Sequence, residues 1–278
     1  TIAGFETLYF KTENPIWQRL SKFWIQVFAV VFGIGVVSGI VMSFQFGTNW
    51  SNFSYATANF LGPVLSYEVI TAFFLEAAFL GVLLFGREKV PQGVHLFAAI
   101  MVATGTFISS FWILSANSLL QTPDGLELID GIYHVKSWAD ALFTASFGYR
   151  FTHMALASFL TAALVVAGVS AWFILQKREL EANKKALSVA LWFLLFLAPL
   201  QTVIGDFHGL NTMKHQPTKV AAMEGNWETS TGVPLLLFAI PDKEAQTNHF
   251  ELKIPKLASF ILTHDWDGEV PGLKAVPK

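Results

Sequence analysis

Five long apolar stretches constrain the fold of this chain more than any other feature of its sequence. They run from Phe23 to Phe46, Pro63 to Phe85, Leu96 to Leu120, Phe151 to Leu175 and Ala186 to Ile204. Each is close to the roughly 20 residues that an α-helix needs to cross the hydrocarbon core of a bilayer. The whole sequence is 53% apolar and only 14% charged, which is unusual for a soluble domain. We therefore predict an all-α fold, a polytopic transmembrane helical bundle surrounded by membrane lipid.

The chain divides into a membrane region and a more polar region. The opening sequence TIAGFETLYF leads into the charged stretch KTENPIWQRLSK as a helix end would, so we expect it to be the remnant of a first span. Together with the five apolar stretches it makes a predicted transmembrane bundle over residues 1–205. Residues 206–278 are polar with scattered prolines, and we expect them to form a loop region outside the membrane.

The loops between the apolar stretches differ in charge. Three basic loops, KTENPIWQRLSK, GREKVPQGVH and QKRELEANKK, alternate with two loops that lack this bias. Cytoplasmic loops carry an excess of Lys and Arg, so every second loop is predicted to lie inside and the residues after 205 outside. The net charge of -2 gives no reason to expect nucleic acid as a partner, and a sequence without cysteine has no disulfide or thiolate metal site.

Two carboxylates lie within the second apolar stretch. Glu68 and Glu76 are eight residues apart, which on an α-helix is about 12 Å of rise and roughly 80° of rotation, so they share a broad face. An ionisable residue inside a span is costly and usually marks ion movement, a proton relay or a bound cofactor. The alternative is a solvated side chain at the membrane surface. That alternative suits Glu68 better than Glu76, because Glu68 is nearer the outer end of the span.

A histidine lies near the outer end of another predicted span. His153 is two residues beyond Phe151, and Arg150 precedes it by one helical turn on the same face. Imidazole is a common axial ligand of haem iron, and a guanidinium can pair with a haem propionate. A histidine at this place can also be an ordinary interfacial side chain, as we expect for His95 at the start of the preceding span.

Hydroxyl groups occur within the span that contains TFISSFWILSAN. Ser109 and Ser110 lie in mid-span, with Thr104, Thr106 and Asn117 in the same segment. Such hydroxyls usually donate to the carbonyls of their own helix. The alternative is a water-lined proton path, which applies if this helix faces Glu76.

Near its start, the polar region contains side chains that could bind an aromatic ring with hydroxyl groups. Lys219 and Glu224 are five residues apart and Trp227 follows them. A surface ion pair is one interpretation. The other is a quinol head group, for which the lysine holds an oxyanion, the glutamate takes a proton and the indole stacks on the ring.

Several motifs together resemble a known family. FQFGTNW (44–50), YEVITAFFLEA (67–77), SSFWILSANS (109–118), YRFTHM and TKVAAMEGNWET occur in this order along nearly the whole chain. They resemble subunit I of the cytochrome bd-type quinol oxidases. The sequence GDFHGLNTMKHQP is similar to the branch often called the cyanide-insensitive quinol oxidases.

The resemblance implies an enzyme of the respiratory chain in the bacterial cytoplasmic (inner) membrane. Such an enzyme oxidises ubiquinol or menaquinol on the outer, periplasmic face and reduces dioxygen to water. Its cofactors are a low-spin b haem, a high-spin b haem and haem d. Its expected partners are a second oxidase subunit and a small accessory subunit.

The resemblance also implies roles for individual residues. His153 matches an axial ligand of the low-spin b haem, and Glu68 matches a glutamate at the high-spin haem pair that touches iron. Glu76 and Ser109 match groups on the proton route to that site. Lys219 and Glu224 match the quinol-binding pair of the long outer loop.

Parts of the family pattern fall outside this sequence. In the family a histidine ligand lies in the first span, and the methionine ligand of the low-spin b haem corresponds to a position beyond Lys278. We therefore expect a subunit that is incomplete at both ends. The alternative function is a proton-coupled transporter in which Glu68 and Glu76 exchange protons, although no internal repeat supports it.

Overall fold

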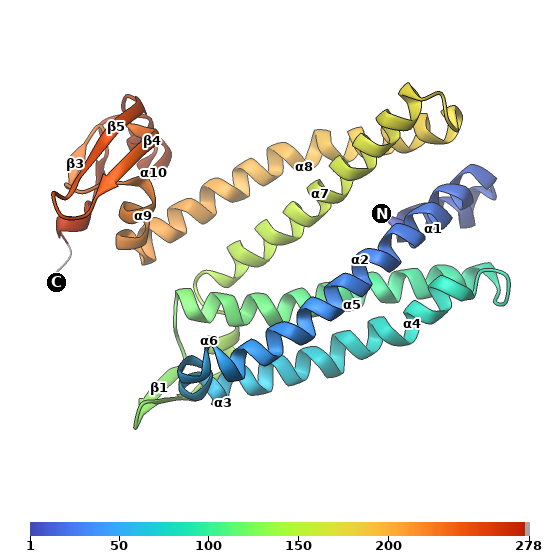
Figure 1. Ribbon diagram of the computed structural model, residues 1–278, viewed down its shortest axis with the longest axis horizontal. Coiled ribbons are helices and arrows are strands. Elements are labelled where there is room, and N and C mark those ends of the chain that lie inside the picture. The colour runs from blue at the N-terminus through green and yellow to red at the C-terminus, as the bar shows by residue number, and fades with distance from the viewer. Residues whose placement is uncertain (276–278) are drawn as a thin grey trace. The chain divides into compact units, whose positions relative to one another are not determined.

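The computed structural model describes residues 1–275 of the chain, shown in Figure 1. The chain divides into two compact units. The first contains Thr1–Phe147 and Met154–Leu200, and the second contains Gly148–His153 and Gln201–Lys278. The two units are described separately below.

Five helical segments are long and apolar enough to cross a membrane, which confirms the predicted polytopic bundle. The helices are α1 (Ile2–Thr12), α2 (Pro15–Thr48), α3 (Ser51–Glu68), α4 (Phe74–Phe85), α5 (Gln92–Gln121), α6 (Trp138–Leu142), α7 (Phe147–Leu175) and α8 (Leu180–His215). Each of the five membrane-spanning segments is longer than the corresponding apolar stretch predicted from the sequence. Helix α8 in particular continues past residue 205, where we had placed the start of the polar region, and ends at His215.

The junction between α1 and α2 is determined by local chemistry. Helix α1 ends where Glu13 adopts a left-handed conformation with φ of 51°. Asn14 then caps α2, since its side-chain oxygen accepts a hydrogen bond of 3.0 Å from the backbone N–H of Ile16. Pro15 occupies the first turn of α2, where its missing N–H costs nothing. The charged stretch is therefore a tight helix-to-helix turn.

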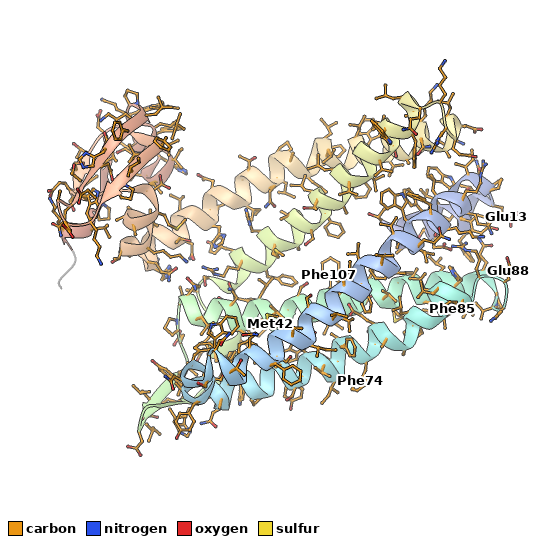
Figure 2. The ribbon with its side chains drawn as sticks, in the orientation of Figure 1. Glu13, Met42, Phe74, Phe85, Glu88 and Phe107 are labelled. Carbon is orange, nitrogen blue, oxygen red and sulfur yellow. The ribbon has the colours of Figure 1, made fainter. Side chains whose placement is uncertain are left out.

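The core of the first unit consists of three clusters of buried side chains. One cluster joins α1, α2, α7 and α8 through residues such as Phe5, Trp24 and Ala186. A second joins α2, α4 and α5, and a third joins α3, α5 and α6. Large apolar side chains on the outer faces of the spans are exposed instead, for example Phe74 and Phe85 on α4, labelled in Figure 2. Such faces suit contact with lipid or with other spans.

The three basic loops lie at one end of the first unit. Figure 2 shows Glu13, between α1 and α2, near Glu88, between α4 and α5. Arg19 of α2 forms an ion pair of 2.9 Å with Glu179, in the turn between α7 and α8. The gathering of these loops agrees with the alternation predicted from their charges.

A β-hairpin lies between α5 and α7. Its strands β1 (Leu126–Ile129) and β2 (Ile132–Val135) are antiparallel, and Asp130 and Gly131 between them both have positive φ. An Asp-Gly pair is the strongest short signal for such a two-residue turn. The sequence therefore carried the signal for this hairpin, although we had not predicted it.

The second unit ends in a small mixed region. It contains α9 (Pro217–Glu224), β3 (Ser230–Thr231), β4 (Leu235–Asp242), β5 (Thr247–Ile254), α10 (Leu257–Thr263), β6 (Glu269–Val270) and a short 3-10 turn (Leu273–Ala275). Strands β4 and β5 form one antiparallel sheet, and β3 and β6 form another. These short sheets are additions to the helical fold that the apolar pattern did not predict.

One serine connects three segments of this mixed region. Ser259 of α10 is fully buried, accepts a hydrogen bond of 2.7 Å from the N–H of Val233, and donates one of 2.8 Å to the carbonyl of Gly268. Removing the hydroxyl leaves the buried N–H of Val233 without its acceptor and the partly buried carbonyl of Gly268 without its donor.

We expect Ser259→Ala to lower the free energy of unfolding of this region by about 1–3 kcal/mol, the usual cost of an unsatisfied buried polar group. The measurement is the rate of proteolysis within residues 206–275 of the purified protein as temperature rises. Ser230→Ala is the matched control, because Ser230 is exposed. Equal cleavage of both variants would contradict the bridging role.

Candidate functional site

The two intramembrane glutamates flank a π-helical turn. Glu68 ends α3, residues Val69–Phe73 form the π-helix, and Glu76 lies in the first turn of α4. A π-turn contains one more residue than an α-turn, so the eight residues rotate about as seven do in an α-helix, roughly 20° short of two full turns. The rotation of roughly 80° that we had predicted is therefore wrong. The π-turn brings the two carboxylates close to one line along the helix.

Both carboxylates accept hydrogen bonds from α5. Ser109 Oγ donates to Glu68 Oε1 at 2.8 Å, and Thr106 Oγ1 donates to Glu76 Oε1 at 2.7 Å. Thr106 and Ser109 are three residues apart, so they lie on one face of α5. The row of two carboxylates on one helix therefore faces a row of two hydroxyls on the next.

A glycine makes room for the inner carboxylate. The side chain of Glu76 is only 8% exposed, and a Cβ atom placed on Gly105 would lie 2.5 Å from its Cγ. The same Cβ would lie 3.2 Å from the carbonyl oxygen of Ala72. Gly105 thus allows α4 and α5 to approach closely with the carboxylate between them.

The hydroxyls of α5 divide between two roles. Ser110 and Ser115 donate to carbonyls of their own helix, as membrane hydroxyls usually do. Ser109 donates to a carboxylate, and its partner is Glu68 rather than Glu76. Sequence reasoning had noted Thr106 only as a mid-span polar residue. Its place one turn before Ser109 was the signal that it shares the same face.

The predicted haem ligand lies in the second unit. The ring centroid of His153 is 5.6 Å from that of His208, with an angle of 61° between the rings. Gln201 Nε2 donates to the carbonyl of His153 at 3.2 Å. A Cβ on Gly205 would lie 3.4 Å from His153 Nε2, so a glycine faces this nitrogen where a larger residue would crowd it.

Two buried polar atoms around His153 have no hydrogen-bond partner among the described residues: His208 Nε2 and Gln201 Oε1. Native proteins rarely leave such atoms unpaired unless water, an ion or a cofactor completes the site. His153 and Arg150, one turn apart on α7, therefore fit a haem whose iron binds the imidazole. Among residues 1–275 no group of three or more metal-ligating side chains is formed, but a haem iron needs only axial ligands from protein.

The predicted quinol residues lie on and after α9. Lys219 and Glu224 belong to this helix, and five residues correspond to roughly 140° of rotation, so they point to different sides. Burial raises the pKa of the Glu224 carboxyl above its ordinary value. His208 lies within electrostatic reach of Lys219 and of Arg150, which places these cations near the His153 site.

Trp227 is held at a pocket of about 380 Å³. Its Nε1 donates to Asn248 Oδ1 at 3.0 Å, and Asn248 Nδ2 donates to the carbonyl of Gly225 at 2.9 Å. Gly225 ends α9 with φ of 69°, a conformation that favours glycine. Trp227 and Gly225 line the pocket, whereas Lys219 and Glu224 are not among its lining residues.

One prediction about a histidine was wrong. We had expected His95 to be an interfacial side chain, but it is 1% exposed and contacts Glu6. Spacing could not reveal this contact, because 89 residues separate the two side chains.

Comparison with known proteins identifies the family. A family model described as cytochrome bd terminal oxidase subunit I matches residues 1–278. The chain belongs to this cytochrome bd subunit I family. It is 35% identical to the cytochrome bd-II ubiquinol oxidase subunit 1 of Escherichia coli (strain K12) over 98% of the chain. It is 34% identical to the cytochrome bd ubiquinol oxidase subunit 1 of Bacillus subtilis (strain 168) over 99% of the chain.

A solved structure agrees with the family. The bd oxidase from Geobacillus thermodenitrificans matches the whole chain with a TM-score of 0.85 and 28% sequence identity. The chain covers 64% of that structure's chain, and it spans 54% and 59% of the two relatives from E. coli and B. subtilis. The bd-type fold and the multi-pass membrane location are thus confirmed. The cyanide-insensitive branch stays a prediction.

We expect Gly105→Ala to destabilise the packing of α4 on α5 by about 1–3 kcal/mol, because the added methyl group overlaps the Glu76 side chain. The measurement is the thermal unfolding midpoint of the purified protein in detergent. Gly81→Ala on α4 is the control, since a Cβ there meets nothing within 4 Å. Equal midpoints for the two variants would show that Gly105 is not a close-approach position.

Proposed function

We propose that this chain is the haem-carrying part of a terminal quinol oxidase, which oxidises quinol on the outer face and reduces dioxygen to water. The observation that carries the proposal is the row of Glu68 and Glu76 facing Ser109 and Thr106 inside a span of a bd-family chain. Reduction of dioxygen consumes protons, so protonatable groups within the membrane have a use there that they lack in an ordinary bundle.

The proposed cofactors are a low-spin b haem, a high-spin b haem and haem d. When bound, they carry electrons from quinol to dioxygen. His153 would hold an iron through its imidazole, and Arg150 would pair with a propionate. Glu68 would contact the oxygen-reducing iron, and the positive charge of the metal would offset the cost of burying a carboxylate.

The residues of α4 and α5 manage protons in this proposal. Glu76 accepts a proton arriving from the inner side and passes it toward Glu68. Thr106 and Ser109 hold the two carboxylates in line through the hydrogen bonds described above. A hydroxyl both donates and accepts, so each can also relay a proton along the row.

Quinol oxidation is assigned to α9 and its surroundings. Lys219 stabilises the developing oxyanion of the quinol, and Glu224 accepts a proton from it. Trp227 offers a ring face for stacking at the edge of its pocket. Because Lys219 and Glu224 point to different sides of α9, they contact a quinol together only at the end of the helix or from its two flanks.

The remaining parts of the proposal follow from the family. The partners are a second oxidase subunit and a small accessory subunit, in the bacterial inner membrane, with residues after 205 on the periplasmic side. Ubiquinol or menaquinol is the proposed substrate, and the relatives from E. coli and B. subtilis described above are named as ubiquinol oxidases. The proton-coupled transporter that the sequence left open receives no support from family membership.

We expect His153→Ala to remove the low-spin haem signal and to abolish quinol oxidation, because the imidazole is the proposed axial ligand. The measurement is a reduced-minus-oxidised optical spectrum of the purified complex, with quinol oxidation rates alongside. His134→Ala is the control, since His134 lies in the β1–β2 hairpin. If the variant kept the low-spin spectrum, His153 would not be the ligand of that iron.

The pH dependence of quinol oxidation tests the proposed role of Glu224 as the proton acceptor. A carboxyl whose pKa is raised above the ordinary value of about 4.3 remains protonated, and unable to accept a quinol proton, up to a higher pH. Quinol oxidation should therefore fall as the pH drops through that raised pKa. We expect Glu224→Gln to slow the reaction roughly 100-fold and to remove this acidic limb.

The matched control for Glu224 is Glu244→Gln, at an exposed position outside the spans. It should keep both the rate and the shape of the wild-type profile. If Glu224→Gln also kept the acidic limb, another group would be the quinol base.

A further inference from the structure

A groove of about 330 Å³ lies between α2, α7 and α8 at the basic-loop end of the first unit. Its walls are mainly apolar, and Phe23 of α2 contacts Phe173 of α7 edge to face, with ring centroids 6.0 Å apart. Two arginines, Arg19 and Arg178, also line the groove. Its volume is at the lower end of the roughly 300–1,000 Å³ of ligand pockets. The groove thus combines an apolar body with a cationic end.

The cationic end has one positive charge in excess. Arg19 of α2 forms an ion pair of 2.9 Å with Glu179, and both side chains are more than half exposed. Arg178 is exposed and forms no ion pair within residues 1–275. A guanidinium binds phosphate oxygens through two parallel hydrogen bonds, so this end of the groove favours a phosphate group.

The turn that carries Arg178 is held in one conformation. Lys177 and Glu179 on either side of it have positive φ, 56° and 43°. Asn183, which is buried, donates from Nδ2 to the carbonyls of Arg178 and Glu179 at 3.1 Å each. Because this backbone is already ordered, binding a ligand there costs little further conformational entropy.

Two polar groups in the body of the groove have no hydrogen-bond partner. Trp24 and Ser170 line the groove and are 8% and 1% exposed. Neither the indole N–H nor the hydroxyl forms a hydrogen bond with any side chain or carbonyl in the described part of the chain. Buried groups of these kinds usually find an acceptor, so both are available to donate to a ligand.

The cations and the unpaired donors lie at two depths. Trp24 follows Arg19 by five residues, and Ser170 precedes Leu175, the last residue of α7, by five residues, so each donor lies about 7.5 Å deeper along its helix. A guanidinium at the end, two donors further in and apolar walls follow the order of phosphate, ester carbonyls and acyl chain in a phospholipid.

We propose that this groove binds one anionic phospholipid of the bilayer. Arg178 and Arg19 hold its phosphate. The indole N–H of Trp24 and the hydroxyl of Ser170 donate to its ester carbonyl oxygens, and the start of an acyl chain lies against the two phenylalanine rings. Basic pockets between spans on the cytoplasmic side suit such head groups, and the loop charges predict that this end is cytoplasmic.

The bound lipid would strengthen the join between α2 and the turn from α7 to α8. The described ion pair across this join, between Arg19 and Glu179, is exposed, and exposed pairs contribute little to stability. A phosphate bound by both arginines would link the same two segments from within the groove.

Two other occupants are distinguishable from a phospholipid. A free phosphate would use the arginines but would not reach the two donors deeper in the groove. A segment of protein would cover the apolar walls and would show no preference among lipids.

The test measures lipid binding to the purified, delipidated complex in detergent. Native mass spectrometry counts bound phosphatidylglycerol, which is anionic, and phosphatidylcholine, which is zwitterionic, as each lipid is added. We expect one phosphatidylglycerol to bind roughly tenfold or more tightly than phosphatidylcholine, because the ammonium of the second lipid offsets its phosphate charge. Arg178→Gln should remove this preference, and inorganic phosphate should not displace the bound lipid.

A second variant and a control complete the binding measurement. Ser170→Ala keeps both arginines and should weaken phosphatidylglycerol binding roughly threefold or more, because one donor is lost. Lys11→Gln is the matched control: Lys11 is exposed in the last turn of α1, at the same end of the first unit, and does not line the groove. It removes the same charge and should leave binding unchanged.

Fluorescence quenching locates the bound lipid. Phosphatidylglycerol with bromine on its acyl chain quenches tryptophans that it contacts. The chain has nine tryptophans, so the signal of Trp24 is obtained as the difference between the wild type and Trp24→Phe. We expect the brominated lipid to quench this signal in the wild type and not in Arg178→Gln.

Equal affinity for the two lipids, or wild-type binding by both Arg178→Gln and Ser170→Ala, would overturn the proposal. Displacement by inorganic phosphate would assign the arginines to a free anion, and an unquenched Trp24 would assign the groove to a protein segment; either result also overturns it. Each variant is compared at an unchanged thermal unfolding midpoint, and if Arg178→Gln does not fold, unchanged binding by Ser170→Ala is decisive. None of these measurements involves quinol oxidation, so the inference is independent of the proposed oxidase function.

Discussion

The hydrocarbon core of a membrane offers no water, so every polar group there depends on a partner that the protein supplies. The hydrogen bonds from α5 to Glu68 and Glu76 meet this requirement. They decide how α3, α4 and α5 pack, because each carboxylate must reach its hydroxyl on the neighbouring helix. The π-turn aligns the two carboxylates and Gly105 gives the inner one space. Structure and proposed chemistry therefore depend on the same few contacts.

The same requirement holds at the basic-loop end of the first unit. There the carboxylate of Glu6 is surrounded by donors from α2, α5 and the α4–α5 loop, so its burial is compensated by charge and hydrogen bonds together. In the second unit, the buried nitrogen of His208 and the buried oxygen of Gln201 are left without partners among the described residues. The contrast agrees with a Glu6 cluster that is satisfied by its own neighbours and a histidine site that is completed by a bound group.

Much of the fold was predictable because each membrane-spanning helix requires a long apolar stretch, which is easily recognised in a sequence. The five apolar stretches and the three basic loops were read directly from the sequence, and the structure confirms five spans with these loops at one end. The Asp-Gly turn of the hairpin was also readable, although we overlooked it. The two-stranded sheets of residues 230–270 were not readable, because short strands of mixed polarity carry little periodic signal.

The residues of the candidate site could be predicted from the sequence, but the contacts between them could not. Composition and spacing singled out Glu68, Glu76, Ser109 and His153, because polar residues within apolar stretches are conspicuous. The sequence by itself determined the membrane class, the number of spans and the residues that needed partners. Only the tertiary structure decided that Thr106 meets Glu76 and that a π-turn lies between the two glutamates. Contacts between residues far apart in the chain arise from packing between helices, whereas spacing reports only neighbours on one helix.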